Sequence, residues 1–262
     1  MFPVIFQLGD TALYTYTTLY SLAIVIGGAY WVMLVHKHFQ TKVDIAINSL
    51  VIMIVFGLLG AKALFVLTNW SKYQNGSFEI WNPASGGVVF YGGALLGAFS
   101  LAIWCKKNKI KVIEAFNLAA APLCIGHIIG RLGCLAHGCC HGKLCSISWL
   151  GTTYSDIRSV ARPLNAPMYP TQLFEIVGLI FLFLILKAEI KKNGSRGNSF
   201  KKYLIGYGTL RFFVEFFRGD SLRGAAYGLS TSQIISILLI ILALFLDLRR
   251  DKYHNSPHEN RS

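Results

Sequence analysis

The sequence predicts an all-α, polytopic integral membrane protein with seven transmembrane helices. Of the 262 residues, 54% are hydrophobic and only 14% are charged, which excludes a disordered chain and argues against an ordinary soluble domain. A bilayer core about 30 Å thick needs roughly 20 mostly apolar residues per helical span, and seven stretches of the chain meet this need. The net charge of +13 falls mainly in alternate connections between these stretches, so it indicates membrane topology and no nucleic-acid partner is expected.

The expected elements follow one another with short connections. Residues 2–6 form a short interfacial segment, and no signal peptide is expected because no basic residue precedes the first apolar stretch. The fourth span is weakened by Glu114, Asn117 and Pro122, and the sixth by Arg211 and Glu215. No internal repeat is found, so we expect one membrane domain over residues 1–252 and a disordered polar tail at 253–262. The seven spans are expected at about 19–35, 45–67, 87–104, 112–129, 171–186, 203–217 and 229–248.

The basic residues predict how these spans are oriented. Lysines and arginines gather at 37–42, 106–111, 187–202 and 249–252, which are every second connection and the end of the last span. Because such residues stay on the cytoplasmic side, we expect an extracytoplasmic N-terminus and a cytoplasmic C-terminus. The cysteine-rich loop at about 131–167 is then extracytoplasmic.

With this topology, polar residues from four segments reach one outward-facing layer. Ionisable groups at membrane depth cost several kcal/mol unless they are paired or face a polar cavity, so they indicate a functional site. Three arginines outnumber the two carboxylates there, and a planar guanidinium suits a phosphate, so we expect a lipid headgroup to bind in a cavity among them. The layer contains glycines 86, 87, 92 and 93 of the third span, Arg131 after the fourth, Gln172 and Glu175 opening the fifth, and Arg211, Glu215 and Arg218 on one helical face of the sixth.

Each of these residues also has a structural interpretation. Glu215 would neutralise Arg211 or Arg218 within one helix, and Gln172 and Glu175 would tie helix ends together. The glycines would allow helices to pack closely, which is their commoner use in membranes. Both interpretations stay open at this point.

Four sequence blocks carry a resemblance to a known family. They are GGVVFYGG at 86–93, GRLGCLAHG at 130–138, YPTQLFE at 169–175 and YGTLRFFVEFFR at 207–218. In this order the chain resembles the prolipoprotein diacylglyceryl transferase family over nearly its whole length. The resemblance implies a multi-pass enzyme of the bacterial inner membrane. It would move the diacylglyceryl group of phosphatidylglycerol onto a lipobox cysteine of a prolipoprotein, release glycerol phosphate and need no cofactor.

The resemblance also implies roles for particular residues. Arg131 takes the place of the signature arginine, Gly142 that of the glycine closing the same motif, and Arg211 that of the essential arginine. Arginines would bind the phosphate and stabilise its departing charge. We expect catalytic roles for Arg131, Arg211, Tyr91, His137 and Glu215, and substrate binding by Gly92, Gly93, Gly133, Cys134, Gly142, Gln172, Glu175 and Arg218.

Two departures from the family pattern bear on the chemistry. Tyr91 stands where the family has a histidine, and tyrosine, with a pKa near 10, is a poorer base at neutral pH. His137 or His141 would then supply the base. Cys134, His137 and Cys139 also replace the asparagines and glutamate of the family. Two alternatives therefore stay open: a sister transferase with a different acceptor, and a non-enzymatic lipid- or metal-binding membrane protein.

Four of the six cysteines, at 134, 139, 140 and 145, fall in the outer loop and allow several interpretations. Disulfides joining 134 with 139 or 140 with 145 suit an oxidising compartment. A metal site of His137, Cys139, His141 and one more thiol is an alternative, although the spacing departs from paired Cys-x-x-Cys ligands, and no metal is expected. Cys139 or Cys140 as a nucleophile, and plain packing, are the remaining possibilities.

Overall fold

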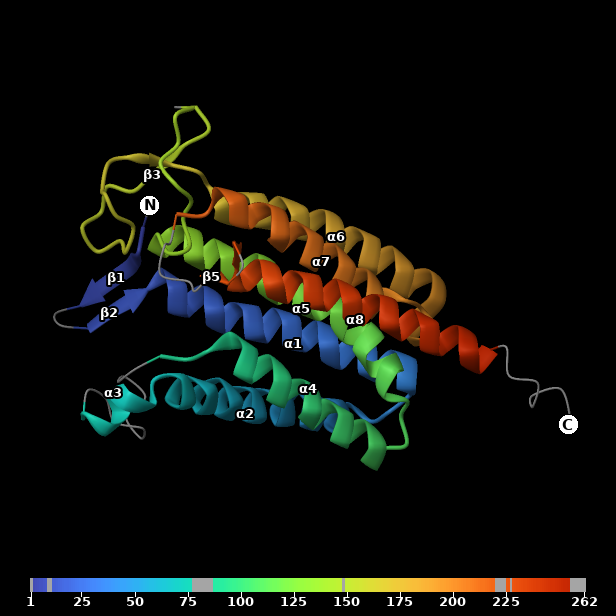
Figure 1. Ribbon diagram of the computed structural model, residues 1–262. Helices are drawn as coiled ribbons and strands as arrows, with labels where there is room; N and C mark the ends of the chain where they lie inside the picture. Colours follow the sequence, from blue (N-terminus) through green and yellow to red (C-terminus); the bar gives the residue numbers. More distant parts are fainter. Residues whose placement is uncertain are drawn as a thin grey trace, which may run out of the picture. The chain divides into compact units, whose positions relative to one another are not determined.

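The computed structural model is mostly helical (Figure 1) and describes residues 2–8, 11–76, 87–147, 149–219, 225–226 and 228–254. Seven long helices overlap the seven expected spans, and three short helical turns, α3 (Trp70–Gln74), η1 (Gly194–Arg196) and η2 (Glu215–Phe217), lie between them. The long helices are α1 (Thr15–Phe39), α2 (Val43–Thr68), α4 (Phe90–Lys107), α5 (Val112–His137), α6 (Thr171–Asn193), α7 (Ser199–Val214) and α8 (Thr231–His254).

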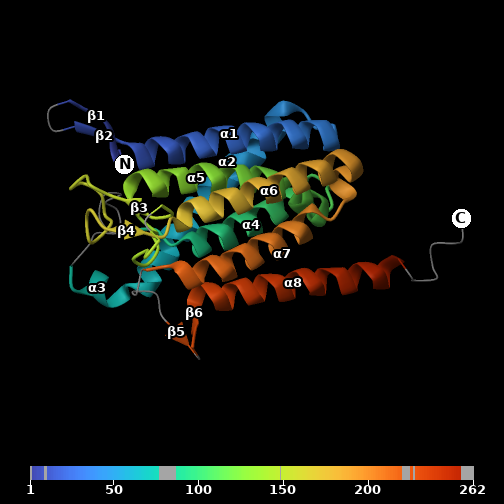
Figure 2. The same ribbon diagram turned by 90° about the horizontal axis from the view of Figure 1, so that it is seen from above.

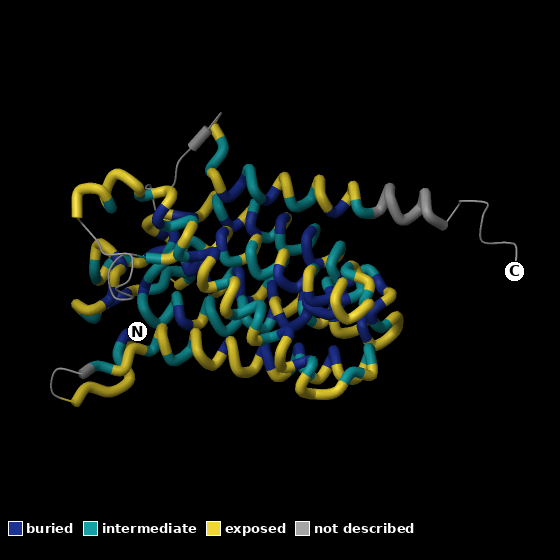
Figure 3. Tube along the Cα trace, turned by 90° about the horizontal axis from the view of Figure 1, so that it is seen from below, coloured by how far each residue is buried: buried dark blue, intermediate teal, exposed yellow. Residues whose placement is uncertain are grey.

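Among the described residues, α1, α2 and α5 are long and apolar enough to cross a membrane by length and composition. Large apolar side chains also lie exposed on other helices, such as Phe181 and Leu184 of α6 and Phe213 of α7. Figure 3 shows exposed and buried residues alternating along the helices. Exposed apolar faces of this kind are typical of a protein surrounded by lipid.

Two of the differences between the expected and observed helix ends affect residues of the predicted site. Helix α5 continues to His137, so Arg131 and Cys134 stand on its last two turns and not in the loop expected from residue 131. Helix α7 ends at Val214, and Arg218 follows η2 in extended conformation instead of continuing the helical face. The reason is long-range pairing, because Arg218 forms an antiparallel β-bridge with Gly142.

In the described residues, three short two-stranded antiparallel sheets accompany the helices, which the all-α prediction did not include. The first, β1 (Val4–Leu8) with β2 (Thr11–Tyr14), replaces the expected interfacial segment, and its β-branched and aromatic residues favour strand structure. The others are β3 (Thr152–Thr153) with β4 (Pro167–Met168), and β5 (Ala225–Ala226) with β6 (Leu229–Ser230).

Helix α8 runs through His254, so the first two residues of the expected polar tail are helical. Between Gly228 and Pro257 the sequence contains no proline or glycine that would end the helix. The rest of that tail, 255–262, and Gly86 of the glycine-rich block lie outside the described residues.

The chain forms two compact units, Met1–Ala29 with Asn117–Ser262, and Tyr30–Phe116. In the second unit, α2 and α4 approach closely through glycines: a Cβ on Gly92 would lie 2.2 Å from the Gly60 carbonyl oxygen, and one on Gly93 would lie 2.9 Å from that of Gly57. These contacts are helix packing by small residues, the structural interpretation of that glycine block.

In the first unit, α6, α7 and α8 lie side by side (Figures 1 and 2). Their connection at η1 is held by the buried Asn117 of α5, whose Nδ2 donates to the carbonyl oxygens of Ser195 (2.9 Å) and Gly197 (2.6 Å). The Asn117 Oδ1 accepts from the Phe200 amide at 3.1 Å. A polar residue that weakened the fourth span in the sequence is therefore fully used to fix the start of α7.

Candidate active site

Glu175 of α6 lies among three arginines in the first unit. Its Oε2 is 2.7 Å from Nε of Arg131, at the end of α5. Its Oε1 is 3.4 Å from Nη1 of Arg211 in α7 and 3.9 Å from Nη1 of Arg218. Glu215 completes the group, with Oε2 2.6 Å from Nη2 of Arg211 and 3.7 Å from Nε of Arg218. The structure therefore brings together the five charged residues that the sequence placed in one layer.

Burial makes this arginine–glutamate cluster electrostatically strong. The side chains of Glu175, Glu215, Arg211 and Arg218 are each at most 8% exposed, whereas that of Arg131 is 19% exposed. Ion pairs in such surroundings are weakly screened by water. Three guanidinium groups face two carboxylates, so these five residues carry one positive charge in excess. Arg131 is the most exposed of the three arginines.

Ser232, in the first turn of α8, is a cluster residue that the sequence analysis missed. The Arg211 Nη2 donates to its Oγ at 2.9 Å, and Ser232 is buried. A serine in an apolar helix gives no distinctive signal by itself, because serine often bonds within its own helix. Only the packing of α7 on α8 brings its hydroxyl to Arg211.

The start of α6 holds the loop that follows α5. Nε2 of Gln172 donates to the Cys139 carbonyl oxygen at 2.8 Å and to the Tyr154 hydroxyl at 3.1 Å, and the Thr171 hydroxyl donates to the Cys140 carbonyl oxygen at 2.7 Å. Oε1 of Gln172 is buried and has no hydrogen-bond partner among the described residues. Gln172 therefore ties the start of α6 to the loop after α5, which agrees with the structural interpretation of this residue. Its Oε1 remains an acceptor that no described residue uses.

Gly142 lies where three backbone segments meet. The Gly142 amide donates to the Tyr169 carbonyl oxygen at 2.9 Å. The amide of Lys143, the following residue, donates to the Phe217 carbonyl oxygen at 2.8 Å. A Cβ on Gly142 would lie within 2.7 Å of the carbonyl oxygens of both Tyr169 and Phe217. The structure thus gives Gly142 a packing role, which places Arg218 next to the glutamates; contact with a substrate stays a prediction.

The last turns of α5 carry the other predicted site residues. Gly133 packs on Tyr16 and Leu19 of α1, where a Cβ would be 3.4 Å from the Tyr16 ring. Arg131 Nη1 lies 3.9 Å from Sγ of Cys134. The centre of the His137 ring lies 5.8 Å from that of the Tyr16 ring. The Nδ1 atom of His137 is buried and has no hydrogen-bond partner among the described residues. His137 therefore keeps a ring nitrogen that no described residue uses.

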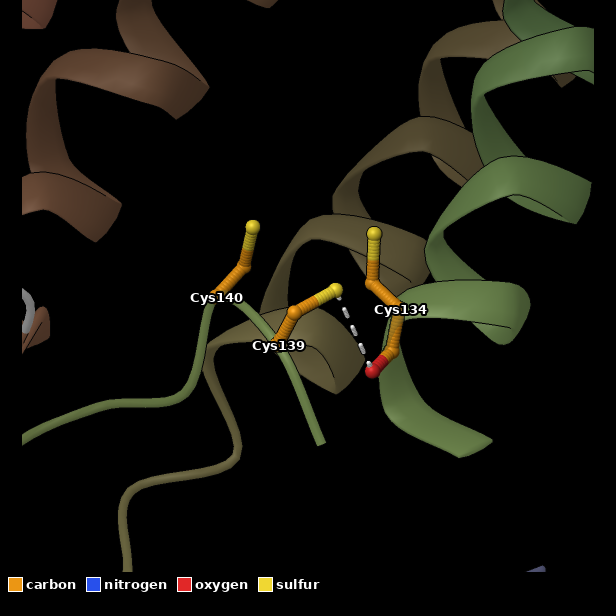
Figure 4. Close-up of side chains that lie close together, drawn as sticks. All are labelled: Cys134, Cys139 and Cys140. Carbon is orange, nitrogen blue, oxygen red and sulfur yellow. Dashed lines mark hydrogen bonds between the residues drawn. The ribbon is translucent and has the colours of Figure 1, made fainter. Parts of the chain in front are cut away.

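Three thiols gather at the end of α5 and in the loop that follows it, as Figure 4 shows. The Sγ atoms of Cys134, Cys139 and Cys140 all lie within 4.8 Å of one another. The chain turns sharply to bring them together, with positive φ at Gly138 (82°) and at Cys140 (63°). The neighbouring thiols of Cys134 and Cys139 lower the pKa of Cys140, and the positive charges of Arg218 and Arg131 lower it further.

The thiol cluster differs from the groupings considered from the sequence. No disulfide joins any of the six cysteines, all of which the structure describes, and the Cys145 thiol donates to the Ile147 carbonyl oxygen at 3.3 Å. Of the alternative metal set His137, Cys139 and His141, only Cys139 belongs to the cluster. The His141 Nδ1 lies 2.9 Å from the Gly142 carbonyl oxygen, and neither His137 nor His141 is in the group of thiols.

Tyr91, Gly92 and Gly93 belong to the second unit. Tyr91 lies in the first turn of α4, 40% exposed, with its ring against that of Phe90. The two glycines serve the packing of α4 on α2, and the part of all three residues in a reaction stays a prediction.

The fold and this cluster define a helical membrane protein with a buried, arginine-rich polar site. The family model for prolipoprotein diacylglyceryl transferase matches residues 3–248, and the chain belongs to that family. It is 36% identical to phosphatidylglycerol–prolipoprotein diacylglyceryl transferase 2 of Clostridium perfringens over 203 residues, 78% of each protein. It is 31% identical to the transferase of the same name, without the numeral, from Clostridium tetani, over 94% of this chain and 96% of that protein. The Bacillus velezensis transferase is also 31% identical, over 95% and 92%.

Proposed function

We propose that this protein transfers the diacylglyceryl group of phosphatidylglycerol to the cysteine thiol of a prolipoprotein and releases glycerol phosphate. The family match over residues 3–248 and the names of the relatives support this activity. The observation that carries the proposal is the buried group of three arginines and two glutamates, whose excess positive charge suits one phosphodiester.

The proposed reaction is a displacement at a glycerol carbon. A thiolate forms the C–S bond while the bond from that carbon to the phosphate oxygen breaks, and negative charge grows on the departing glycerol phosphate. Donors already fixed where charge develops stabilise a transition state without reorganising. Arg131 would bind the phosphate through its two Nη atoms while Glu175 holds its Nε, and Arg211 and Arg218 would supply further positive charge.

Neighbouring polar atoms would complete the substrate site. The unused Oε1 of Gln172 would accept a hydrogen bond from a headgroup hydroxyl. His137, whose buried Nδ1 has no hydrogen-bond partner among the described residues, would take the proton of the incoming thiol. Gly133, Cys134 and Gly142 would line the approach to Arg131.

We also propose that all seven long helices span the bacterial inner membrane within one membrane domain over residues 1–252. The shortest, α7, has 16 residues and is about 24 Å long at 1.5 Å per residue, and η2 extends it toward the thickness of the hydrocarbon core. The alternate basic connections support an extracytoplasmic N-terminus and a cytoplasmic C-terminus.

The experiment is a peptide lipidation assay. Purified protein in detergent is incubated with phosphatidylglycerol and a lipobox peptide, and the peptide mass is followed. We expect a diacylglyceryl adduct that falls at least 100-fold in Arg131→Ala and Arg211→Ala, since removing one such donor costs about 10²–10³ in rate. Arg158→Ala is the matched control, because Arg158 is exposed and pairs only with Asp156 among the described residues.

The alternatives give different results in the same assay. Consumption of phosphatidylglycerol without a peptide adduct would indicate a sister transferase with a different acceptor. Binding of the lipid without any turnover would indicate a lipid-binding protein. An adduct formed equally well by Arg131→Ala would contradict the proposed role of the cluster.

A further inference from the structure

We propose that Cys134, Cys139 and Cys140 bind one Zn²⁺ ion and leave its fourth coordination position open for an incoming thiol. The three Sγ atoms already lie within 4.8 Å of one another. In a tetrahedral site with Zn–S bonds of about 2.3 Å the sulfur atoms stand about 3.8 Å apart, so a contraction of about 1 Å or less completes the site. Figure 4 shows the three sulfur atoms on the same side of the loop.

The backbone that carries these thiols is fixed without a metal. The Cys134 carbonyl oxygen accepts from the amides of Gly138 (2.9 Å) and Cys139 (3.1 Å), which closes the end of α5. The carbonyl oxygens of Cys139 and Cys140 are held by the buried side chains of Gln172 and Thr171. Ligands positioned by such surrounding bonds bind a metal with little loss of conformational freedom.

The ligand type selects the ion. Sulfur ligands favour thiophilic ions such as Zn²⁺, whereas Mg²⁺ and Ca²⁺ require oxygen ligands. Zinc sites with four protein ligands are structural, and those with three protein ligands keep a position for water or substrate. The three cysteines are only partly buried, so an ion and a further ligand reach them from outside.

The charges around the thiols suit a zinc–thiolate centre. Three thiolates and one Zn²⁺ carry a net charge of −1. Arg131 Nη1, 3.9 Å from Sγ of Cys134, places a positive charge and an N–H donor beside this centre. Guanidinium groups that donate to metal-bound sulfur stabilise the anionic form.

The function of the open position rests on the proposed transferase activity. The acceptor thiol binds zinc as the fourth ligand and is deprotonated by coordination. Zinc then replaces His137 as the group that activates the thiol, and the proton goes to solvent. Its sulfur electron pair then forms the bond to the glycerol carbon as the carbon–oxygen bond to phosphate breaks and glycerol phosphate leaves. The product is a neutral thioether, a weak zinc ligand, and dissociates. A zinc-bound acceptor needs no histidine at position 91.

The test begins with metal binding alone. Reduced, metal-free protein is loaded anaerobically with zinc chloride, desalted and analysed for metal per chain. We expect one zinc in the wild type, and less than one tenth of that in Cys134→Ser, Cys139→Ser and Cys140→Ser. Cys145→Ser, in the same loop but outside the cluster, keeps the full amount. A wild type that retains no zinc overturns the proposal, even where a serine variant fails to fold.

Cobalt then reports the ligands and the open position. Protein loaded with cobalt chloride instead of zinc should show thiolate-to-cobalt charge-transfer bands. A lipobox peptide should increase these bands, and its cysteine-to-serine counterpart should leave them unchanged. Lipidation at full rate by metal-free protein overturns the zinc proposal and leaves the transferase function standing. Zinc binding with a spectral response but no lipidation overturns the transferase function and leaves the metal site.

Discussion

Glu175 lies within ion-pair distance of Arg131, Arg211 and Arg218, and its side chain is 1% exposed. Its charge therefore links α6 to the end of α5 and to the stretch from α7 to Arg218, which are far apart in the sequence. Breaking a buried ion pair by removing one partner is costly because the remaining charge stays buried without compensation. Without the Glu175 charge, Glu215 still pairs with Arg211 and Arg218, whereas Arg131 loses its ion-pair partner.

Replacing Glu175 by glutamine tests this arrangement at the scale of one residue. Glu175→Gln keeps the shape of the side chain and removes its charge, so we expect the free energy of unfolding to fall by about 3–5 kcal/mol. Thermal or denaturant unfolding of the detergent-solubilised protein measures the change. Asp156→Asn is the control, because Asp156 pairs with Arg158 at the surface. Loss of this exposed ion pair should not measurably change the free energy of unfolding. An unchanged stability in Glu175→Gln would show that the cluster does not support the fold.

At the scale of elements, Gly142 joins the loop after α5 to the start of α6 and to the end of η2. A Cβ there would lie 2.5 Å from Cβ of Tyr169 and 2.7 Å from the Phe217 carbonyl oxygen. Gly142→Ala should therefore lower the free energy of unfolding by about 1–3 kcal/mol or more through overpacking against backbone. It should also reduce transfer activity, because Arg218 loses its position.

The control for Gly142→Ala is Gly126→Ala. Gly126 lies inside α5, and a Cβ there would meet nothing within 4 Å. Alanine favours a helix interior by about 1 kcal/mol over glycine, so this variant should be as stable as the wild type or slightly more so. Equal losses in both variants would refute the proposed junction at Gly142.

The connection between α6 and α7 predicts a dependence of stability on pH. Glu189, beyond the predicted span 171–186, binds Lys202, Asn193 and the Asn198 amide. Lys202 first, and then Asn193, lower the pKa of Glu189 from 4.5 to about 2. A lowered pKa in the folded state stabilises the fold above pH 4.5, and this contribution disappears as the pH falls toward 2.

We therefore expect the melting temperature to fall between pH 5 and pH 2, and to fall less in Glu189→Gln, which has no proton to gain. Differential scanning fluorimetry across this range measures the difference. Equal falls in both proteins would mean that Glu189 does not contribute to acid sensitivity.

The elements also show what the sequence could predict. All seven long helices were located, because long apolar runs determine helices in a membrane. The end of α5 was missed, because the apolar run ends near residue 129, whereas the helix continues to His137 and packs on Tyr16 of α1 through Gly133. The extended conformation of Arg218 depends on pairing with Gly142, 76 residues away in sequence, which no local pattern records.

In the candidate site, too, the sequence revealed the residues that stand out locally and not those that depend on long-range contacts. Arg131, Glu175, Arg211, Glu215 and Arg218 could be identified because buried charges in an apolar chain stand out and must find partners. The cysteine grouping could not be derived, because it depends on positive φ angles at Gly138 and Cys140 and on carbonyl contacts from α6.

At the scale of the whole molecule, the distribution of positive charge governs orientation in the membrane. Twenty-five lysines and arginines outnumber twelve acidic residues, and their clusters lie in alternate connections. Positively charged connections are retained on the cytoplasmic side during insertion, so the proposed orientation rests on sequence charge and on no contact in the folded state.

Fusion reporters test this orientation on the full set of helices. Alkaline phosphatase, which is active only outside the cytoplasm, should be active when fused after Trp149, an 84% exposed residue of the loop between α5 and α6. It should be inactive after Asn108 or after Gly197, where lysines and arginines flank α4 and η1. A fluorescent protein joined at the C-terminus should be fluorescent, because the proposed orientation places that end in the cytoplasm. The opposite pattern would place the arginine–glutamate cluster on the cytoplasmic side, away from prolipoproteins whose lipobox has crossed the membrane, and would contradict the proposed transfer.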